Sequence, residues 1–270
     1  MNNTPTRLRL TPMRILYLLI ILAALAGCAI FGDDKEDETA DWSAEKLYAE
    51  AKESLESEYY TKAIEYYEKL LARHPFGVHA QQAQLDLAYA YYKNDESASA
   101  AAACDRFIKL YPDHSHVDYA YYLKGLANFN TGKGLTERYL PVDPSQRDQA
   151  TASKSFQDFS ELVKRFPKSR YVKDAQLRMT YLRNLLAQHE INTAHYYMRR
   201  GAYVAAANRA RYVVENYQRA PAMPEALFMM AKAYRVLKLD DLANDAIRVL
   251  EINYPNHPGI NEIKSLRVSE

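Results

Sequence analysis

Two histidines and two aspartates near the middle of the chain have side chains that could bind a metal ion. His114 and His116 stand two residues apart, with Asp113 before them and Asp118 after them. Imidazole and carboxylate groups are common metal ligands. However, these residues follow Pro112, where a turn is expected, and two histidines at this spacing arise often by chance. We therefore predict no metal site here, and no bound cofactor elsewhere in the chain.

A phosphate-binding loop is a second candidate, at Gly132 and Lys133. The P-loop pattern needs Ser or Thr after its lysine, whereas Gly134 stands there, and Ala127 occupies the place of the first glycine. The chain also lacks the HExxH, CxxC and GxSxG patterns, and it has no obvious Ser and Lys nucleophile pair. The sequence thus predicts that the protein is not an enzyme.

The first 28 residues have the pattern of a targeting segment rather than of part of a fold. Three arginines, Arg7, Arg9 and Arg14, precede an apolar run from Ile15 to Leu25. This run is too short for a membrane-spanning helix, which needs about 20 residues. It ends in Leu-Ala-Gly-Cys at residues 25–28, which resembles the lipobox of bacterial lipoproteins. An ordinary secretory signal and a chance match are the alternatives.

The lipobox resemblance implies a cleaved signal peptide over residues 1–27 and a lipid anchor on Cys28. The anchor would be an S-diacylglycerol and an N-palmitoyl chain, and several acyl chains together hold a protein stably at a membrane. Ala29 follows the cysteine, and the absence of Asp there favours the periplasmic face of the outer membrane. Residues 32–41 are acidic and polar, so we expect residues 28–42 to form the lipidated cysteine and a solvated tether. Cys104 is expected to be a small buried residue, with a functional thiol as the alternative.

The composition excludes several classes of protein. Only 8 of the 270 residues are glycine, well below the usual share of about 7%, which argues against folds built on tight turns. The 35 Lys and Arg residues nearly balance 34 Asp and Glu residues, so no strongly basic field predicts nucleic-acid binding. Hydrophobic content of 48% and charged content of 26% are typical of an ordered globular protein. The chain also has 23 tyrosines, an unusual number.

The body of the chain repeats one pattern, in which a helix-like run ends in a basic or aromatic residue and a proline. Proline cannot continue a helix, so each one marks a stop. Small residues recur twelve positions before each proline, and a further copy keeps this spacing with Gln218 in place of the proline. The prolines are Pro75, Pro112, Pro167 and Pro255, and the small residues are Ala63, Ala100, Ser155 and Ala243.

Two helices per 34–37 residues, with small residues where they cross, resemble the tetratricopeptide repeat. The fold we predict is all-α, a right-handed α-solenoid of five tetratricopeptide-like helix pairs. The pairs are expected at residues 43–77, 80–114, 117–169, 187–219 and 224–257.

Two excess segments divide this array. An insertion near 131–149 contains Gly, Pro and Asp and predicts an exposed loop within the third pair. Residues 174–188 predict an extended helix that connects an N-terminal half, 43–173, to a C-terminal half, 174–260. Residues 261–270 are expected to form a C-terminal tail.

A binding surface is expected on the first helices of the pairs, which line the concave side in this class of repeat. Counting from the small residue in each first helix places several aromatic side chains there, and tyrosine suits the capture of extended peptides. The alternative is that these rings only pack between repeats. The residues are Tyr48, Tyr89, Tyr92, Tyr119, Tyr122 and Phe129.

Four stretches of the chain resemble the BamD family of outer-membrane assembly lipoproteins. They are Arg73 to Asn94, His116 to Leu126, Val142 to Asp148 and Arg200 to Arg209. The resemblance implies a scaffold of the β-barrel assembly machinery, the BAM complex, in a Gram-negative outer membrane. It implies binding to the periplasmic POTRA domains of BamA, to accessory lipoproteins such as BamC or BamE, and to unfolded outer-membrane proteins. In that family the N-terminal repeats are linked to client segments that end in an aromatic residue.

The resemblance also implies that the more cationic C-terminal half contacts BamA. We assign Arg199, Arg200, Tyr203 and Arg209 to that contact as a hypothesis. Two other functions remain as alternatives. One is a pilotin-like repeat lipoprotein of type IV pili that assists secretin assembly. The other is a periplasmic hydrolase with a helical solenoid, for which the chain shows no catalytic domain.

Overall fold

The structure is a computed structural model that describes residues 37–131 and 149–265. By internal contacts the chain divides into residues 1–42 and 43–270, and every helix given below lies in the second unit. Cys28, the signal peptide, residues 28–36 of the tether and residues 132–148 of the insertion lie outside the described residues. None of the helices in the described part is long and apolar enough to cross a membrane.

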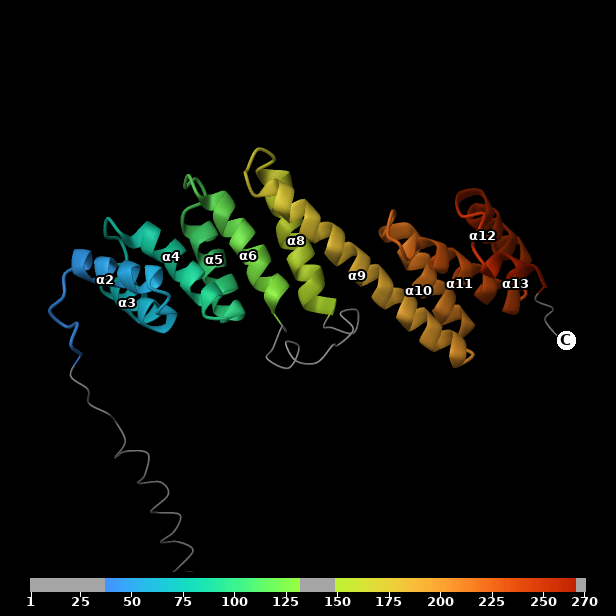
Figure 1. Ribbon diagram of the computed structural model, residues 1–270, viewed down its shortest axis with the longest axis horizontal. Coiled ribbons are helices and arrows are strands. Elements are labelled where there is room, and N and C mark those ends of the chain that lie inside the picture. The colour runs from blue at the N-terminus through green and yellow to red at the C-terminus, as the bar shows by residue number, and fades with distance from the viewer. Residues whose placement is uncertain (1–36, 132–148, 266–270) are drawn as a thin grey trace, which may run out of the picture. The chain divides into compact units, whose positions relative to one another are not determined.

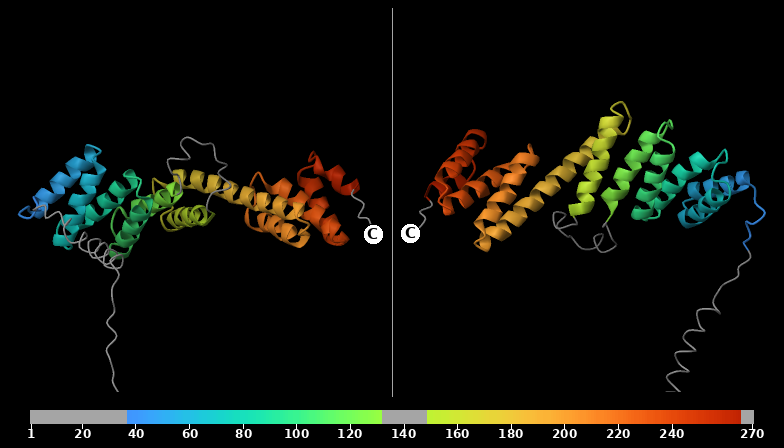
Figure 2. Two further views of the ribbon diagram at one scale, coloured as in Figure 1. Left: turned by 90° about the horizontal axis from the view of Figure 1, so that it is seen from below. Right: turned by 180° about the vertical axis from the view of Figure 1, so that it is seen from behind.

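The regular secondary structure of the described residues is entirely helical (Figure 1). The helices pair as antiparallel neighbours in chain order, and each packs against the next (Figure 2). This confirms the all-α class and the five predicted pairs. The pairs are α2 (Ala44–Glu56) with α3 (Tyr60–Arg73), α4 (Ala80–Lys93) with α5 (Ser97–Leu110), α6 (Val117–Asn130) with α8 (Gln149–Arg165), α9 (Val172–Arg199) with α10 (Tyr203–Asn216), and α11 (Met223–Val236) with α12 (Asp240–Asn253), followed by α13 (Gly259–Ser265).

The turns within four of the pairs share one backbone conformation. Two residues after the last residue of the first helix, the chain has a positive φ of 59–73°. This left-handed residue ends a helix by letting the next N–H groups bond back to the last carbonyls. Glycine adopts it at no steric cost, yet three of the four positions are not glycine. The residues are Glu58, Asp95, Gly201 and Lys238.

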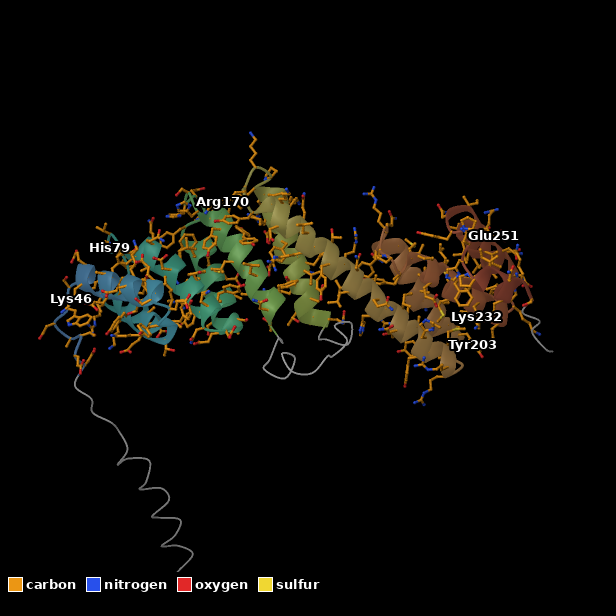
Figure 3. All side chains as sticks on the ribbon, in the orientation of Figure 1. Lys46, His79, Arg170, Tyr203, Lys232 and Glu251 are labelled. Carbon is orange, nitrogen blue, oxygen red and sulfur yellow. The ribbon has the colours of Figure 1, made fainter. Side chains whose placement is uncertain are left out.

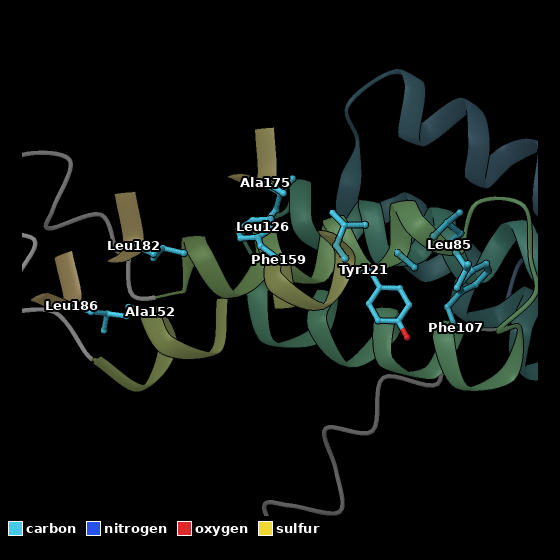
Figure 4. Close-up of a cluster of buried hydrophobic side chains, with 12 residues drawn as sticks. Leu85, Phe107, Tyr121, Leu126, Ala152, Phe159, Ala175, Leu182 and Leu186 are labelled. Carbon is cyan, nitrogen blue, oxygen red and sulfur yellow. The ribbon is translucent and has the colours of Figure 1, made fainter. Parts of the chain in front are cut away.

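The small residues that repeat in the sequence lie where the paired helices cross. Ala63 and Ala100 are fully buried, as is Ser155, whose hydroxyl donates to the carbonyl of Gly125 at 3.0 Å. Glycine at position 125 lets α6 approach α8 closely, because a Cβ there would lie 2.5 Å from the ring of Phe159 on α8. Figure 4 shows Phe159 in the apolar cluster that this crossing builds. The predicted role of the small residues is therefore confirmed.

Helix α9 runs unbroken for 28 residues and includes the segment expected to connect the two halves. In its first half, Ala175 and Leu182 join the cluster around Phe159 of α8. In its second half, Ala187 and Ile191 join a separate cluster with α10 and α11. One helix therefore serves both as a cover for the third pair and as the first helix of the fourth.

The expected C-terminal tail at 261–270 is wrong for residues 261–265, which belong to α13. Ile260 and Ile263 are buried against α11, and Gly259 lies so close to Phe228 that a Cβ would meet its ring. The last pair of a repeat array leaves an apolar side without a neighbour, and a short terminal helix covers it here. Residues 266–270 lie outside the described part.

Candidate functional site

The six aromatic residues predicted to form a groove all lie on first helices, namely α2, α4 and α6. All six are partly buried, so they neither stand free nor belong wholly to the core. We call this set the aromatic face; it consists of Tyr48, Tyr89, Tyr92, Tyr119, Tyr122 and Phe129.

One end of the aromatic face is held by a carboxylate on the neighbouring first helix. The hydroxyls of Tyr48 and Tyr67 donate to Oδ2 of Asp86 at 3.3 and 3.4 Å, and Gln82 donates to Oδ1 at 2.7 Å. The Tyr48 ring stacks on His79 with centroids 4.6 Å apart. Burial raises the pKa of Asp86 against the opposing effect of these donors, and burial and Asp86 raise the pKa of Tyr48 to about 12. Tyr48 therefore remains a neutral donor with a fixed ring.

A second carboxylate holds the other end. Tyr122 of α6 donates to Oδ2 of Asp174 on α9 at 2.7 Å, and Arg178 donates to the same oxygen at 2.6 Å. Burial opposes ionisation of Asp174, but these two donors outweigh it and lower its pKa. Burial and the bond to Asp174 raise the pKa of Tyr122 to about 12. The Tyr122 ring stacks on Tyr171, 4.7 Å away, and the Arg178 guanidinium lies 5.1 Å from the ring centroid of Phe129.

The middle of the aromatic face carries hydroxyls with unused bonding capacity. Those of Tyr89 and Tyr119 have no hydrogen-bond partner among the residues that the structure describes. Tyr92 accepts a bond from Asn130 at 3.1 Å, and burial raises the pKa of Tyr119. Free hydroxyls lie between two tyrosines that carboxylates fix in place, which is an arrangement suited to a ligand with both apolar and polar groups.

Several contributors to this face were missed from the sequence. His79 and Asp86 support Tyr48, and Tyr171, Asp174 and Arg178 extend the face onto α9. The Asp174 and Arg178 spacing of four residues was a usable signal, because such pairs meet on a helix surface. The contacts between repeats gave no signal, since they join residues 38 and 52 positions apart.

Three of the four residues that we assigned to the BamA contact lie at the turn between α9 and α10. Arg199 ends α9, Arg200 follows it, and Tyr203, which is labelled in Figure 3, begins α10. The Arg200 guanidinium lies 5.2 Å from the Tyr196 ring, and neither arginine has an ion-pair partner among the described residues. Arg209 lies farther along α10 and pairs with Glu190 at 3.0 Å. We call Arg199, Arg200 and Tyr203 the basic turn.

The other candidates from the sequence, His114 with His116 and Cys104, make contacts within the fold. The backbone N–H of His116 donates to Nδ1 of His114 at 3.1 Å, so that nitrogen is already engaged. Over the described ranges, no group of three or more His, Cys, Asp or Glu residues is placed to hold a metal ion. Cys104 is fully buried, which confirms its predicted packing role, and burial raises its pKa.

Comparison with known proteins places these surfaces in a family. Residues 40–250 match the family described as "YfiO: Outer membrane lipoprotein". A curated relative from Neisseria meningitidis serogroup B, named "Outer membrane protein assembly factor BamD", is 46% identical over 92% of this chain and 94% of its own length. A relative of the same name from Xylella fastidiosa is 36% identical over 90% of this chain and 84% of its own.

A solved structure titled "Functional Characterization of Pseudomonas Aeruginosa pilF" is 15% identical and covers 93% of both chains with a TM-score of 0.38. That likeness is too weak to support an argument. The family match covers most of this chain, and relatives named BamD align over about nine-tenths of it. The chain therefore belongs to the YfiO family of outer membrane lipoproteins, together with these BamD relatives.

Proposed function

We propose that this chain is a lipid-anchored scaffold on the periplasmic side of the outer membrane, where it assists the assembly of β-barrel proteins within the BAM complex. The family and the names of the relatives support the assembly role. The anchor would be the acylated Cys28, and no catalytic step is required. A scaffold acts by raising the effective concentration of a client beside the machinery that inserts it.

The aromatic face would receive the unfolded client. The observation that carries this proposal is the pair of free hydroxyls, on Tyr89 and Tyr119, between the fixed Tyr48 and Tyr122. Rings that are already immobile lose little entropy when a peptide binds. An extended segment could lay apolar or aromatic side chains on these rings and place its backbone polar groups on the hydroxyls.

The basic turn would bind a partner of opposite charge, which we propose to be the POTRA region of BamA. Arg199 and Arg200 are exposed and lack acidic partners among the described residues, so an acidic surface can pair with them without breaking an existing ion pair. Arg209 is less available because it already pairs with Glu190. Further contacts with lipoproteins such as BamC or BamE belong to the same proposal.

Depletion of the chain in its own cells tests the proposed function. We expect folded outer-membrane barrels of many kinds to fall and unfolded clients to collect in the periplasm. A Cys28→Ser variant, which cannot be acylated, should restore barrel levels less well than the wild-type chain. Normal barrel levels after depletion would refute the proposal. Loss of secretin assembly alone would support the pilotin alternative instead.

A further inference from the structure

A cavity of about 460 Å³ opens between α3 and α5, with α4 as its floor. Helices α3 and α5 both pack on α4. The floor residues Gln84, Leu87 and Tyr91 recur at helical spacing, so they share one side of α4. Asp86 and Tyr89 lie roughly 200° from Gln84 and Leu87, respectively, around the same helix. The cavity therefore opens on another side of α4 than Asp86 and Tyr89, although Tyr89 packs in the same cluster as the wall residue Ala103.

The side-chain amide of Gln84 is the unusual feature of this cavity. Gln84 is only 5% exposed, and no hydrogen bond to its amide is found among the described residues. Its nitrogen and oxygen are not among the buried polar atoms that lack a partner in the described residues, so they are open to the cavity, where a ligand can reach them. An amide has both a donor and an acceptor, and a peptide group presents the complementary pair.

The other helix pairs show what this position needs for packing alone. The equivalent residue stands four positions before the small residue of each first helix. Leu47 and Leu227 are buried in the core there. Tyr121 packs against Phe166, and Glu190 pairs with Arg209. The charged member of this set, Glu190, has a partner, whereas the Gln84 amide has none among the described residues and faces the cavity, so it is available to a ligand.

The walls of the cavity define what the ligand must present. Ala72, Ala102 and Ala103 are small and leave room, while Leu71 offers apolar contact. At the rim, Tyr91 donates to Glu68, and burial together with this bond raises the pKa of Tyr91. Arg106 is exposed at the rim and has no hydrogen-bond or ion-pair partner in the described part of the chain.

We propose that this cavity is a second peptide-binding site, which holds an extended segment of a partner protein. One peptide group of that segment pairs with the amide of Gln84, and an acidic side chain pairs with Arg106. The small alanines accommodate the backbone between the two walls. The cavity and the aromatic face are formed by different residues, so binding at each can be tested separately.

Binding of a labelled peptide to the purified mature chain tests the site. The probe is a fluorescein-labelled decapeptide of Ala and Thr with one central Glu, and a matched peptide carries Lys in its place. We expect the Glu peptide to bind at least tenfold more tightly than the Lys peptide. Gln84→Leu should weaken that binding about tenfold and leave the fold intact, since leucine occupies the position in two other pairs.

Three further variants sharpen the result. Ala102→Trp should block the cavity from an exposed position, and Arg106→Glu should reverse the preference to the Lys peptide. Tyr122→Ala, on α6 at the other end of the aromatic face, should leave decapeptide binding unchanged, which distinguishes this site from the aromatic face. Equal affinity for the two peptides, or unchanged affinity in Gln84→Leu, would overturn the proposal. So would sedimentation of a wild-type dimer that Ala102→Trp converts to a monomer, because a second copy would then be the occupant.

Discussion

Tyr122 and Asp174 join two parts of the array that lie 52 residues apart, through a hydrogen bond of 2.7 Å from the tyrosine hydroxyl to the carboxylate. Arg178 supports the same oxygen from one turn farther along α9. At the other end of the aromatic face, Asp86 plays the corresponding part for Tyr48. The two carboxylates differ in burial, so they respond oppositely to pH.

The pH dependence of stability should differ in sign between Asp174 and Asp86. The pKa of Asp174 is lowered in the folded state, so it stabilises the fold above its unfolded pKa of about 3.9, and this contribution is lost as the pH falls through the folded value. The pKa of Asp86 is raised in the folded state, so its contribution to stability grows as the pH falls towards 3.9. Urea unfolding at several values from pH 3 to 7 gives the free energy of unfolding as a function of pH. Compared with the wild-type chain, the slope of this free energy against pH should change in opposite directions in Asp174→Asn and Asp86→Asn. A change in the same direction in both variants would contradict the assigned pKa shifts.

The left-handed turn residues predict a pair of opposite effects on stability. Gly201→Ala should cost about 1–2 kcal/mol, although a Cβ there meets nothing within 4 Å, because the cost lies in its φ of 73°. Lys238→Gly should stabilise by about 0.5–1 kcal/mol by relieving the same strain. Ala49→Gly in the exposed interior of α2 is the matched control and should cost about 1 kcal/mol. Chemical denaturation measures all three, and a stabilising Gly201→Ala would refute the explanation.

The crossing of α6 and α8 predicts a coupling between Gly125 and Phe159. Gly125→Ala should destabilise by about 1–3 kcal/mol, because the new methyl group overlaps the ring. In a Phe159→Leu background the same change should be neutral or favourable, since alanine is the better helix former. A double-mutant cycle from denaturation curves measures the coupling. Purely additive effects would show that the two residues do not constrain each other.

The sequence predicted the helix pairs well because their cause is local and periodic. Small residues at a fixed spacing and prolines at the exits correctly placed Ser155 at the crossing of α6 and α8, where its hydroxyl donates to the carbonyl of Gly125. The position of a residue relative to the small residue of its first helix did not separate surface residues from core residues as cleanly. Tyr48 and Tyr122 share their register with Leu85, Ile191 and Phe228, which are buried. Whether that position is open depends on how neighbouring pairs approach, and one helix taken alone does not contain that information.

The features that the sequence did not reveal depend on contacts between distant residues. Helix α13 has only seven residues and no repeat partner, so its apolar residues gave too short a pattern to recognise. The support of Tyr122 by Asp174 required knowing that α9 lies beside α6. The unpaired state of Gln84 likewise appears only when the neighbouring helices are in place.

The basic turn predicts a salt-dependent association with an acidic partner. Reversing the charges of Arg199 and Arg200 to Glu should lower the affinity for the isolated POTRA domains of BamA at least tenfold at low ionic strength. The difference should shrink as salt rises, because exposed charges are screened. Arg209→Ala should have a smaller effect, since Arg209 already pairs with Glu190. Surface plasmon resonance at several salt concentrations tests this, and equal loss in both variants would contradict it.

The assignment of client binding to the aromatic face and of BamA binding to the basic turn is tested most directly by measuring both binding reactions on one variant. The ligands are a client peptide that ends in phenylalanine and the POTRA domains of BamA, and the variant is Tyr89→Ala with Tyr92→Ala. Circular dichroism should confirm that helicity is retained, and Tyr59→Ala on the exposed start of the first pair's second helix serves as the control. We expect at least tenfold weaker binding of the peptide and unchanged binding of the POTRA domains. Equal loss of both, or unchanged peptide affinity, would contradict the assignment of client binding to the aromatic face.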